Sequence, residues 1–266
     1  RIFVTLNTIL YDDELEAAYR QMLAVQDAGA DAVIAADLGT IGMVKKYAPK
    51  CELHVSVQSG IVNYETANAF YNLGAHRVVT ARELSLAEIA EIRAKTPKEL
   101  EIEAFAHGAM CVSFSGRCLL SNYLVNRDAN RGECAQPCRW EYAIMEVKRD
   151  GMYFPIQDSK EGTYILNSKD MCMIEHIPDL IEAGIDSYKI EGRMKTALYV
   201  ATVARTYRKA INDYLESPEK YQENMPWYLD QISNCTYRQF TTGFFYNKPT
   251  NETQIYDNNT YEKGYT

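Results

Sequence analysis

Short runs of β-branched and apolar residues alternate with amphipathic stretches along most of this chain, and this alternation limits the possible folds more than any other feature. Three segments show the change most clearly: AGADAVI (28–34), LGAHRVV (73–79) and AGIDSYKI (183–190). In each, a glycine separates a helix-like stretch from an apolar run, and glycine is common just after the last turn of a helix. The repeated pattern therefore predicts βα units that follow one another along the chain.

The periodicity of the apolar residues places these units. It predicts strands at residues 2–7, 32–37, 53–58, 77–81, 100–106 and 187–191. It predicts helices at residues 12–28, 40–47, 63–73, 85–95, 175–183 and 196–215. Strands that alternate with helices form right-handed βαβ units around a parallel sheet. We therefore expect an α/β fold and, because the unit repeats, a (β/α)8 TIM-like barrel rather than an open doubly wound sheet.

The domain organisation follows from the two places where the alternation stops. Residues 107–165 hold four of the seven cysteines and a β-rich stretch, so we expect an insertion after a barrel strand. From residue 216 the chain is rich in Tyr, Asn and Thr, so we expect a linker and the start of a small β-rich C-terminal module over residues 216–266. The barrel would cover residues 1–215. The chain begins with Arg1 inside a strand-like segment, which predicts that the barrel is N-terminally incomplete.

Composition and charge argue against several classes of protein. The net charge of −8 argues against attraction of nucleic acid to the whole surface, although a local basic face is compatible with it. No apolar run approaches the roughly 18 residues that span a membrane, and no signal peptide is visible. We therefore expect a cytoplasmic protein that does not bind membranes. The seven cysteines are an odd number, which argues against a framework of disulfides.

Four cysteines lie close together in the sequence: Cys111, Cys118, Cys134 and Cys138. The gaps between them are six, fifteen and three residues, which differ from the C-x2-C pairs of structural zinc sites and from ferredoxin motifs. In a cytosolic chain, a group of cysteines more often binds a metal or an iron–sulfur centre than forms disulfides. Spacing alone leaves three interpretations open: a 4Fe–4S cluster, a zinc site, or buried cysteines that bind nothing.

Polar residues follow several predicted strands, at the positions where barrel enzymes carry their active sites. These residues are Asn7, Asp37, Gln58, Arg82, Glu83, His107, Glu191 and Arg193. Lys189 and Glu191 alternate within one strand, so their side chains lie on the same face and can both point into the barrel. A buried ion pair that fills the barrel centre is the alternative for these two residues.

The segment 116–140 is rich in arginine. Its arginines are Arg117, Arg127, Arg131 and Arg139. Such a group of cations can bind RNA phosphates, and an ordinary solvated surface is the alternative. Arg139 is next to a cysteine and Arg193 follows a strand end, so either guanidinium can pair with a dicarboxylate metabolite.

The cysteine region resembles a known family. The pattern E-x-F-x-x-G-A-M-C-x6-C-x-x-S is similar to a signature of the collagenase-like (U-32) peptidase family. It consists here of Glu103, Phe105, Gly108, Ala109, Met110, Cys111, Cys118 and Ser121. NRDANRGECAQPCRW (126–140) and residues 168–211 resemble that family as well. The resemblance covers nearly the whole chain, but the two βα units with which family members usually begin are missing.

Despite the family name, the resemblance implies hydroxylation rather than proteolysis. Residues 126–140 and 190–195 are most similar to the tRNA uridine hydroxylase branch, which uses prephenate to form 5-hydroxyuridine at the wobble position. Other branches modify a cytidine of large-subunit ribosomal RNA or support oxygen-independent ubiquinone synthesis. The resemblance therefore implies a 4Fe–4S cluster, redox-active or structural, with tRNA and a small dicarboxylate such as prephenate as partners.

The candidate residues fall into three roles, of which the resemblance implies only the first. The implied cluster ligands are Cys111, Cys118, Cys134 and Cys172, with Cys138 as an alternative ligand. The candidate catalytic residues are Glu103, His107, Lys189, Glu191 and Arg193. The candidate substrate-binding residues are Arg117, Arg131 and Arg139.

A peptidase of the U-32 family is the alternative function. The chain has four histidines, no H-E-x-x-H motif and no G-x-S-x-G motif. A cysteine peptidase needs a cysteine of low pKa near a histidine, and His107, four residues before Cys111, is the local candidate. A non-catalytic iron–sulfur partner of a larger complex and an rRNA hydroxylase are further alternatives.

Overall fold

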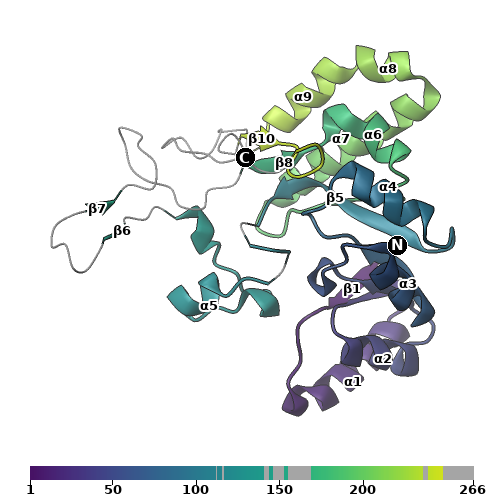
Figure 1. Cartoon of the computed structure of the whole chain (residues 1–266), viewed down its shortest axis with the longest axis vertical. Coiled ribbons are helices and arrows are strands. Elements are labelled where there is room, and N and C mark those ends of the chain that lie inside the picture. Colours follow the sequence, from purple (N-terminus) through teal and green to yellow (C-terminus); the bar gives the residue numbers. More distant parts are fainter. Residues whose placement is uncertain are drawn as a thin grey trace. The chain divides into compact units, whose positions relative to one another are not determined.

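The computed structural model describes residues 1–111, 113–115, 117–140, 144–145, 153–154, 169–235 and 239–247 (Figure 1). Contacts divide the chain into two compact units. Unit 1 comprises residues 1–104, 113–135 and 181–188, and unit 2 comprises residues 105–112, 136–180 and 189–266. The chain crosses between the units within three elements, which are β5 (Glu101–Ala109), α6 (Ile177–Glu182) and β9 (Ser187–Ile190).

Unit 1 is built from βα units. Its strands are β1 (Phe3–Leu6), β2 (Ala32–Ala35), β3 (Glu52–Val55), β4 (Ala75–Val79) and the first part of β5. Its helices are α1 (Leu15–Asp27), α2 (Leu38–Tyr47), α3 (Tyr64–Asn72), α4 (Leu86–Ala94) and α5 (Leu120–Val125), with the 3-10 turns η1 (Asp12–Glu14), η2 (Val57–Ser59) and η3 (Ala129–Arg131). The strands pair in parallel in the order β1-β2-β3-β4-β5. The strands and the helices α1 to α4 confirm the prediction from sequence.

Local sequence signals begin and end these elements. The side chain of Asp37 accepts a hydrogen bond from the backbone N–H of Thr40 at 3.0 Å, so this strand-end residue is the N-cap of α2. The glycines of the three repeated segments, Gly29, Gly74 and Gly184, follow helices with φ angles of 76°, 95° and 74°. These positive angles suit glycine because it has no Cβ atom. The glycines therefore make the predicted turns from helix to strand.

Unit 2 combines short strands with a group of helices. Its strands are the last part of β5, β8 (Asp170–Cys172), the end of β9, β10 (Phe240–Thr241), and the antiparallel pair β6 (Ile144–Met145) and β7 (Tyr153–Phe154). Its helices are α7 (Ala197–Glu216), α8 (Pro218–Glu223), α9 (Met225–Ser233) and most of α6, with the turns η4 (Pro137–Arg139) and η5 (Ile174–His176). None of the described helices has the length and apolar character required to cross a membrane.

The segment after residue 216 differs from the expected start of a β-rich module, because it forms the helices α8 and α9. Tyr221 and Tyr228 of these helices are fully buried, and the Tyr228 hydroxyl donates to Oδ2 of Asp213 in α7 at 2.6 Å. A tyrosine-rich composition thus serves a helical core here, which composition alone does not reveal. Residues on both sides of position 216 belong to unit 2. The domain boundary at residue 216 stays a prediction.

The large sheet of the described residues has eight strands, with the order β1-β2-β3-β4-β5-β8-β10 and β9 paired to β5. The pairings of β1 with β2, β2 with β3, β3 with β4, β4 with β5 and β8 with β10 are parallel, whereas β8 pairs antiparallel to β5. This confirms the α/β class with a mainly parallel sheet. In the described part of the chain, β1 and β10 end the strand order and do not pair with each other. The sheet is therefore not closed, and the (β/α)8 barrel is not confirmed.

Candidate functional site

The candidate site in unit 2 is centred on His107, a side chain of β5 that is 1% exposed. Its ring packs against those of Tyr199, Tyr207 and Phe240, with centroid distances of 6.0, 5.5 and 5.7 Å. Burial, and to a lesser extent the positive charge of Lys195, lowers the pKa of His107 to about 3. His107 is therefore a neutral imidazole at neutral pH, enclosed by aromatic rings.

The hydroxyl of Tyr207 connects several groups of this site. It donates to the carbonyl oxygen of Ala106 at 2.9 Å and accepts from the backbone N–H of Met173 at 2.9 Å. It also lies 3.3 Å from Nδ1 of His107 and 3.8 Å from Sγ of Cys172. Because its single proton is donated to Ala106, the bond to His107 requires a proton on Nδ1. Nε2 of His107 is then an acceptor, and it has no hydrogen-bond partner among the described residues.

Cys172 lies in β8, opposite His107 in the β5–β8 pair. Burial raises the pKa of its thiol to about 11, so the side chain is neutral at neutral pH. A metal ligand must lose this proton, and the positive charge of a bound metal favours that loss. A peptidase nucleophile needs a lowered pKa instead, so Cys172 does not resemble one.

The surroundings of Gly108 explain why the segment H-G-A-M-C (107–111) has a glycine at its second position. The backbone N–H of Glu191 donates to the carbonyl oxygen of His107 at 2.8 Å, which brings the end of β9 against β5. A Cβ atom at Gly108 would lie 2.3 Å from the carbonyl oxygen of Glu191, and Gly108 has a φ angle of 112°. Both the close approach and the backbone angle require glycine.

We expect Gly108→Ala to lower the free energy of unfolding by about 2–3 kcal/mol, because the added methyl group strains the backbone and displaces Glu191. Urea-induced unfolding measures the change. Gly42→Ala is the matched control, since Gly42 lies in α2 and its added Cβ would meet no atom within 4 Å beyond its chain neighbours and the backbone of its own helix. The control should be neutral or stabilising by up to about 1 kcal/mol. Equal losses for the two variants would contradict the close approach at Gly108.

Three further candidate catalytic residues lie in or just after β9. The ammonium of Lys189 lies 5.7 Å from the centre of the Phe105 ring. Oε1 of Glu191 accepts from the backbone N–H of Arg193 at 3.0 Å. The Arg193 side chain is exposed. These positions are compatible with substrate contact by Arg193, and the catalytic roles of all three residues stay predictions.

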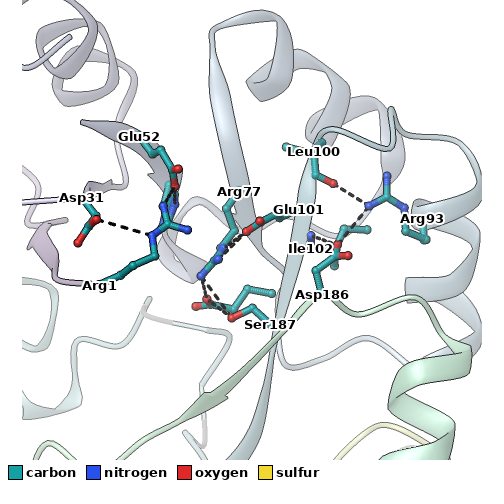
Figure 2. A network of polar contacts seen from close by, with 12 residues as sticks. Arg1, Asp31, Glu52, Arg77, Arg93, Leu100, Glu101, Ile102, Asp186 and Ser187 are labelled. Atoms are coloured by element: carbon teal, nitrogen blue, oxygen red, sulfur yellow. Dashed lines mark hydrogen bonds and ion pairs between the residues drawn. The ribbon is translucent and has the colours of Figure 1, made fainter. Parts of the chain in front are cut away.

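Glu103 belongs to unit 1, where it is buried and pairs with Arg77. Figure 2 shows Arg77 with its neighbours Glu101 and Ser187. Its Oε2 accepts from Nη1 of Arg77 at 2.9 Å and from the hydroxyl of Ser187 at 2.8 Å. Arg77 also donates from Nε to Oε2 of Glu101 at 2.7 Å. These contacts give Glu103 a structural role, and its catalytic role stays a prediction.

The candidate substrate-binding arginines differ in their surroundings. Arg117 of unit 1 is exposed. Arg131 of unit 1 pairs with Glu14 (Nη1 to Oε2, 3.1 Å) and lies 5.7 Å from the centre of the Tyr11 ring. The side chain of Arg139 is outside the described residues. Arg117 can therefore reach a phosphate directly, whereas Arg131 would first have to leave its ion pair.

The remaining candidate metal ligands are divided between the units. Cys118 and Cys134 belong to unit 1, and Cys111 and Cys138 belong to unit 2. No disulfide joins any of the seven cysteines, all of which the structure describes. Among the described residues, no three His, Cys, Asp or Glu side chains form a group that could hold a metal ion. The ligand set therefore stays a prediction from the sequence.

The sequence matches the family described as Peptidase family U32 over residues 1–255. The chain belongs to this family. The U32 chain is 39% identical to tRNA hydroxylation protein P1 of Bacillus subtilis over 257 residues, which are 96% of this chain and 60% of the relative. It is 40% identical to an uncharacterized protease of Methanocaldococcus jannaschii over 249 residues, 92% of this chain and 59% of the relative. It is 39% identical to the 23S rRNA 5-hydroxycytidine C2501 synthase of Escherichia coli over 216 residues, 81% of this chain and 31% of the relative.

The U32 chain thus spans about three fifths of the length of the first two of these relatives. Two of the three names refer to RNA hydroxylation or hydroxycytidine synthesis, and one refers to a protease. The resemblance that the cysteine region predicted is confirmed at the level of the family.

Two tyrosines of the U32 site are not identified by the sequence pattern. Tyr199 and Tyr207 recur at helical spacing, which predicts only that they face the core. Both are indeed buried in α7, but the Tyr207 hydroxyl also contacts His107 and Cys172. The sequence signal that could have identified them is a tyrosine on an otherwise apolar helix face. A buried hydroxyl requires a hydrogen-bond partner, so such a tyrosine indicates a polar group nearby.

Proposed function

We propose that this U32 chain is part of an RNA hydroxylase that forms 5-hydroxyuridine at the wobble position of tRNA, with prephenate as co-substrate. The observation that carries the proposal is the 39% identity to a tRNA hydroxylation protein along 96% of the chain. The similarity to a 23S rRNA 5-hydroxycytidine synthase supports the more general class, hydroxylation of a pyrimidine in RNA. Such a protein would act in the cytoplasm, where tRNA is present.

The proposal includes a 4Fe–4S cluster held by Cys111, Cys118, Cys134 and Cys172. The donor set fits this group chemically, because four thiolates are its usual ligands and no disulfide occupies the four thiols. Cys172 is held in β8 by backbone pairing with β5, and Cys111 follows the end of β5 by two residues. When bound, the cluster would supply one-electron transfer.

The chain's own residues would bind and orient the substrates. The exposed guanidinium of Arg117 suits an RNA phosphate, and Arg131 would add charge if it released Glu14. The exposed Arg193 suits a carboxylate of prephenate, which a guanidinium binds through two parallel hydrogen bonds. His107 is buried and neutral, so it would act through its hydrogen bonds rather than through charge.

The test uses the full-length protein and its gene. Deletion of the gene should remove 5-hydroxyuridine and its derivatives from tRNA, and complementation should restore them, as measured by mass spectrometry of nucleosides. Loss of hydroxycytidine from 23S rRNA with unchanged tRNA would reassign the substrate. Unchanged nucleosides in both RNAs would contradict the proposal, and tRNA binding without turnover would indicate a non-catalytic partner. Iron and sulfide in protein purified without oxygen test the cluster separately.

The names of the family and of one relative make a peptidase the second candidate. The described geometry supports it less well. Nδ1 of His107 is bonded to Tyr207, and the Cys172 thiol opposite it in the sheet has a raised pKa. Cleavage of a collagen-like peptide by the metal-free protein would favour the peptidase over the hydroxylase.

A further inference from the structure

Nε2 of His107 and the hydroxyl oxygen of Tyr199 are buried polar atoms of unit 2 that have no hydrogen-bond partner within the described part of the chain. The two residues are 1% and 4% exposed, and their ring centroids are 6.0 Å apart. Buried polar atoms that lack a protein partner usually bond to ordered water, because an unsatisfied buried group destabilises the fold. A single partner between the two neighbouring rings would satisfy both atoms.

We propose that one neutral, water-sized molecule is bound between Nε2 of His107 and the hydroxyl of Tyr199. His107 offers an acceptor there, because its proton is on Nδ1 and faces Tyr207. Tyr199 offers its O–H as a donor. Water donates to the first atom and accepts from the second, so it satisfies both at once.

The charges near these atoms favour a neutral molecule over an ion. The ammonium of Lys195 lies 4.9 Å from the centre of the Tyr199 ring and 3.7 Å from Oδ2 of Asp170, a fully buried carboxylate. These opposite charges compensate each other. Phe240 adds an apolar ring 5.7 Å from that of His107. An ion here would lose its hydration, whereas water needs only the two hydrogen bonds.

The bound molecule would extend a chain of polar groups inside unit 2. The chain leads from Sγ of Cys172 to the Tyr207 hydroxyl over 3.8 Å and from there to Nδ1 of His107 over 3.3 Å. The proposed molecule continues it from Nε2 to Tyr199. His107 would then be held at both ring nitrogens, which makes Tyr199 a positioning residue for His107.

A crystal structure of the full-length protein, purified without oxygen, tests the proposal directly. We expect one spherical peak of density about 2.6–3.2 Å from both Nε2 of His107 and the Tyr199 hydroxyl. The same peak should be missing from crystals of Tyr199→Phe. A wild-type site without density, or with the elongated density of a larger compound, would overturn the proposal.

The melting temperature of Tyr199→Phe gives a second test. Loss of a hydroxyl that bonds the proposed molecule should lower the melting temperature by roughly 2–4 °C. Loss of an unsatisfied hydroxyl should raise it, so a value equal to or above that of the wild type would overturn the proposal. Tyr123→Phe is the control, because Tyr123 is 85% exposed in α5 and should show no change. The wild type and the variant are compared at equal iron content. Neither the electron density nor the melting temperature depends on which RNA is the substrate.

Discussion

Arg77→Met is expected to lower the free energy of unfolding by about 3–5 kcal/mol, because it removes the guanidinium that is paired with the buried Glu103 carboxylate. The Arg77 side chain is 9% exposed and that of Glu103 is 8% exposed, and their ion pair measures 2.9 Å. Methionine keeps most of the arginine stem but removes the charge. Glu103 would then retain its hydrogen bond from the Ser187 hydroxyl, which measures 2.8 Å, whereas the Glu101 side chain is 43% exposed and can be solvated.

A second substitution shows whether the loss is electrostatic. The double variant of Arg77→Met with Glu103→Gln also removes the charge of the buried carboxylate, and the amide oxygen can still accept from Ser187. We expect it to recover most of the lost stability in denaturant unfolding. Lys95→Met is the control, because Lys95 pairs with Glu91 at 2.6 Å at an exposed position and should contribute less than about 1 kcal/mol. No recovery in the double variant would contradict a buried ion pair.

The elements of unit 1 could be predicted because local sequence specifies them. The strand β2 is a short, fully buried apolar run that follows the turn at Gly29, and α2 begins at a capping Asp37. The strands β8 and β10 are three and two residues long, which is too short to show a period. Their existence depends on pairing between residues as distant as Asp170 and Phe240. Barrel closure depends on distant pairing in the same way, so local signals do not determine it.

The residues of the candidate site show the same difference between local sequence signals and contacts that depend on the fold. His107 is identified by its place at a strand end, and the cysteines are identified by their motif. The partner of Glu103 is 26 residues away in β4, and nothing in the motif around Glu103 indicates Arg77. The need for glycine at position 108 becomes clear only when Glu191 is seen against β5. The chemical type of each side chain is thus known from the sequence, whereas the residues that it contacts are known only from the fold.

Cys172→Ser in the full-length protein is expected to lose most of its iron and sulfide, while Cys138→Ser keeps them. Cys172 is fixed in β8 by backbone pairing with β5, and a serine oxygen is a poor replacement for a thiolate in an iron–sulfur cluster. Cys138 lies in the short turn η4 and is the alternative ligand. Iron and sulfide analysis of protein purified without oxygen, together with its visible spectrum, measures the difference.

Cys51→Ser is the control for loss of a thiol as such. The Cys51 thiol donates to the carbonyl oxygen of Ala30 at 3.3 Å, a bond that serine can keep, so this variant should retain its iron. If Cys138→Ser loses the iron and Cys172→Ser retains it, Cys138 is the fourth ligand. A colourless wild-type protein would contradict the proposed cluster and leave the family assignment intact. Because iron content is measured without any substrate, the result decides the ligand set independently of whether tRNA or rRNA is modified.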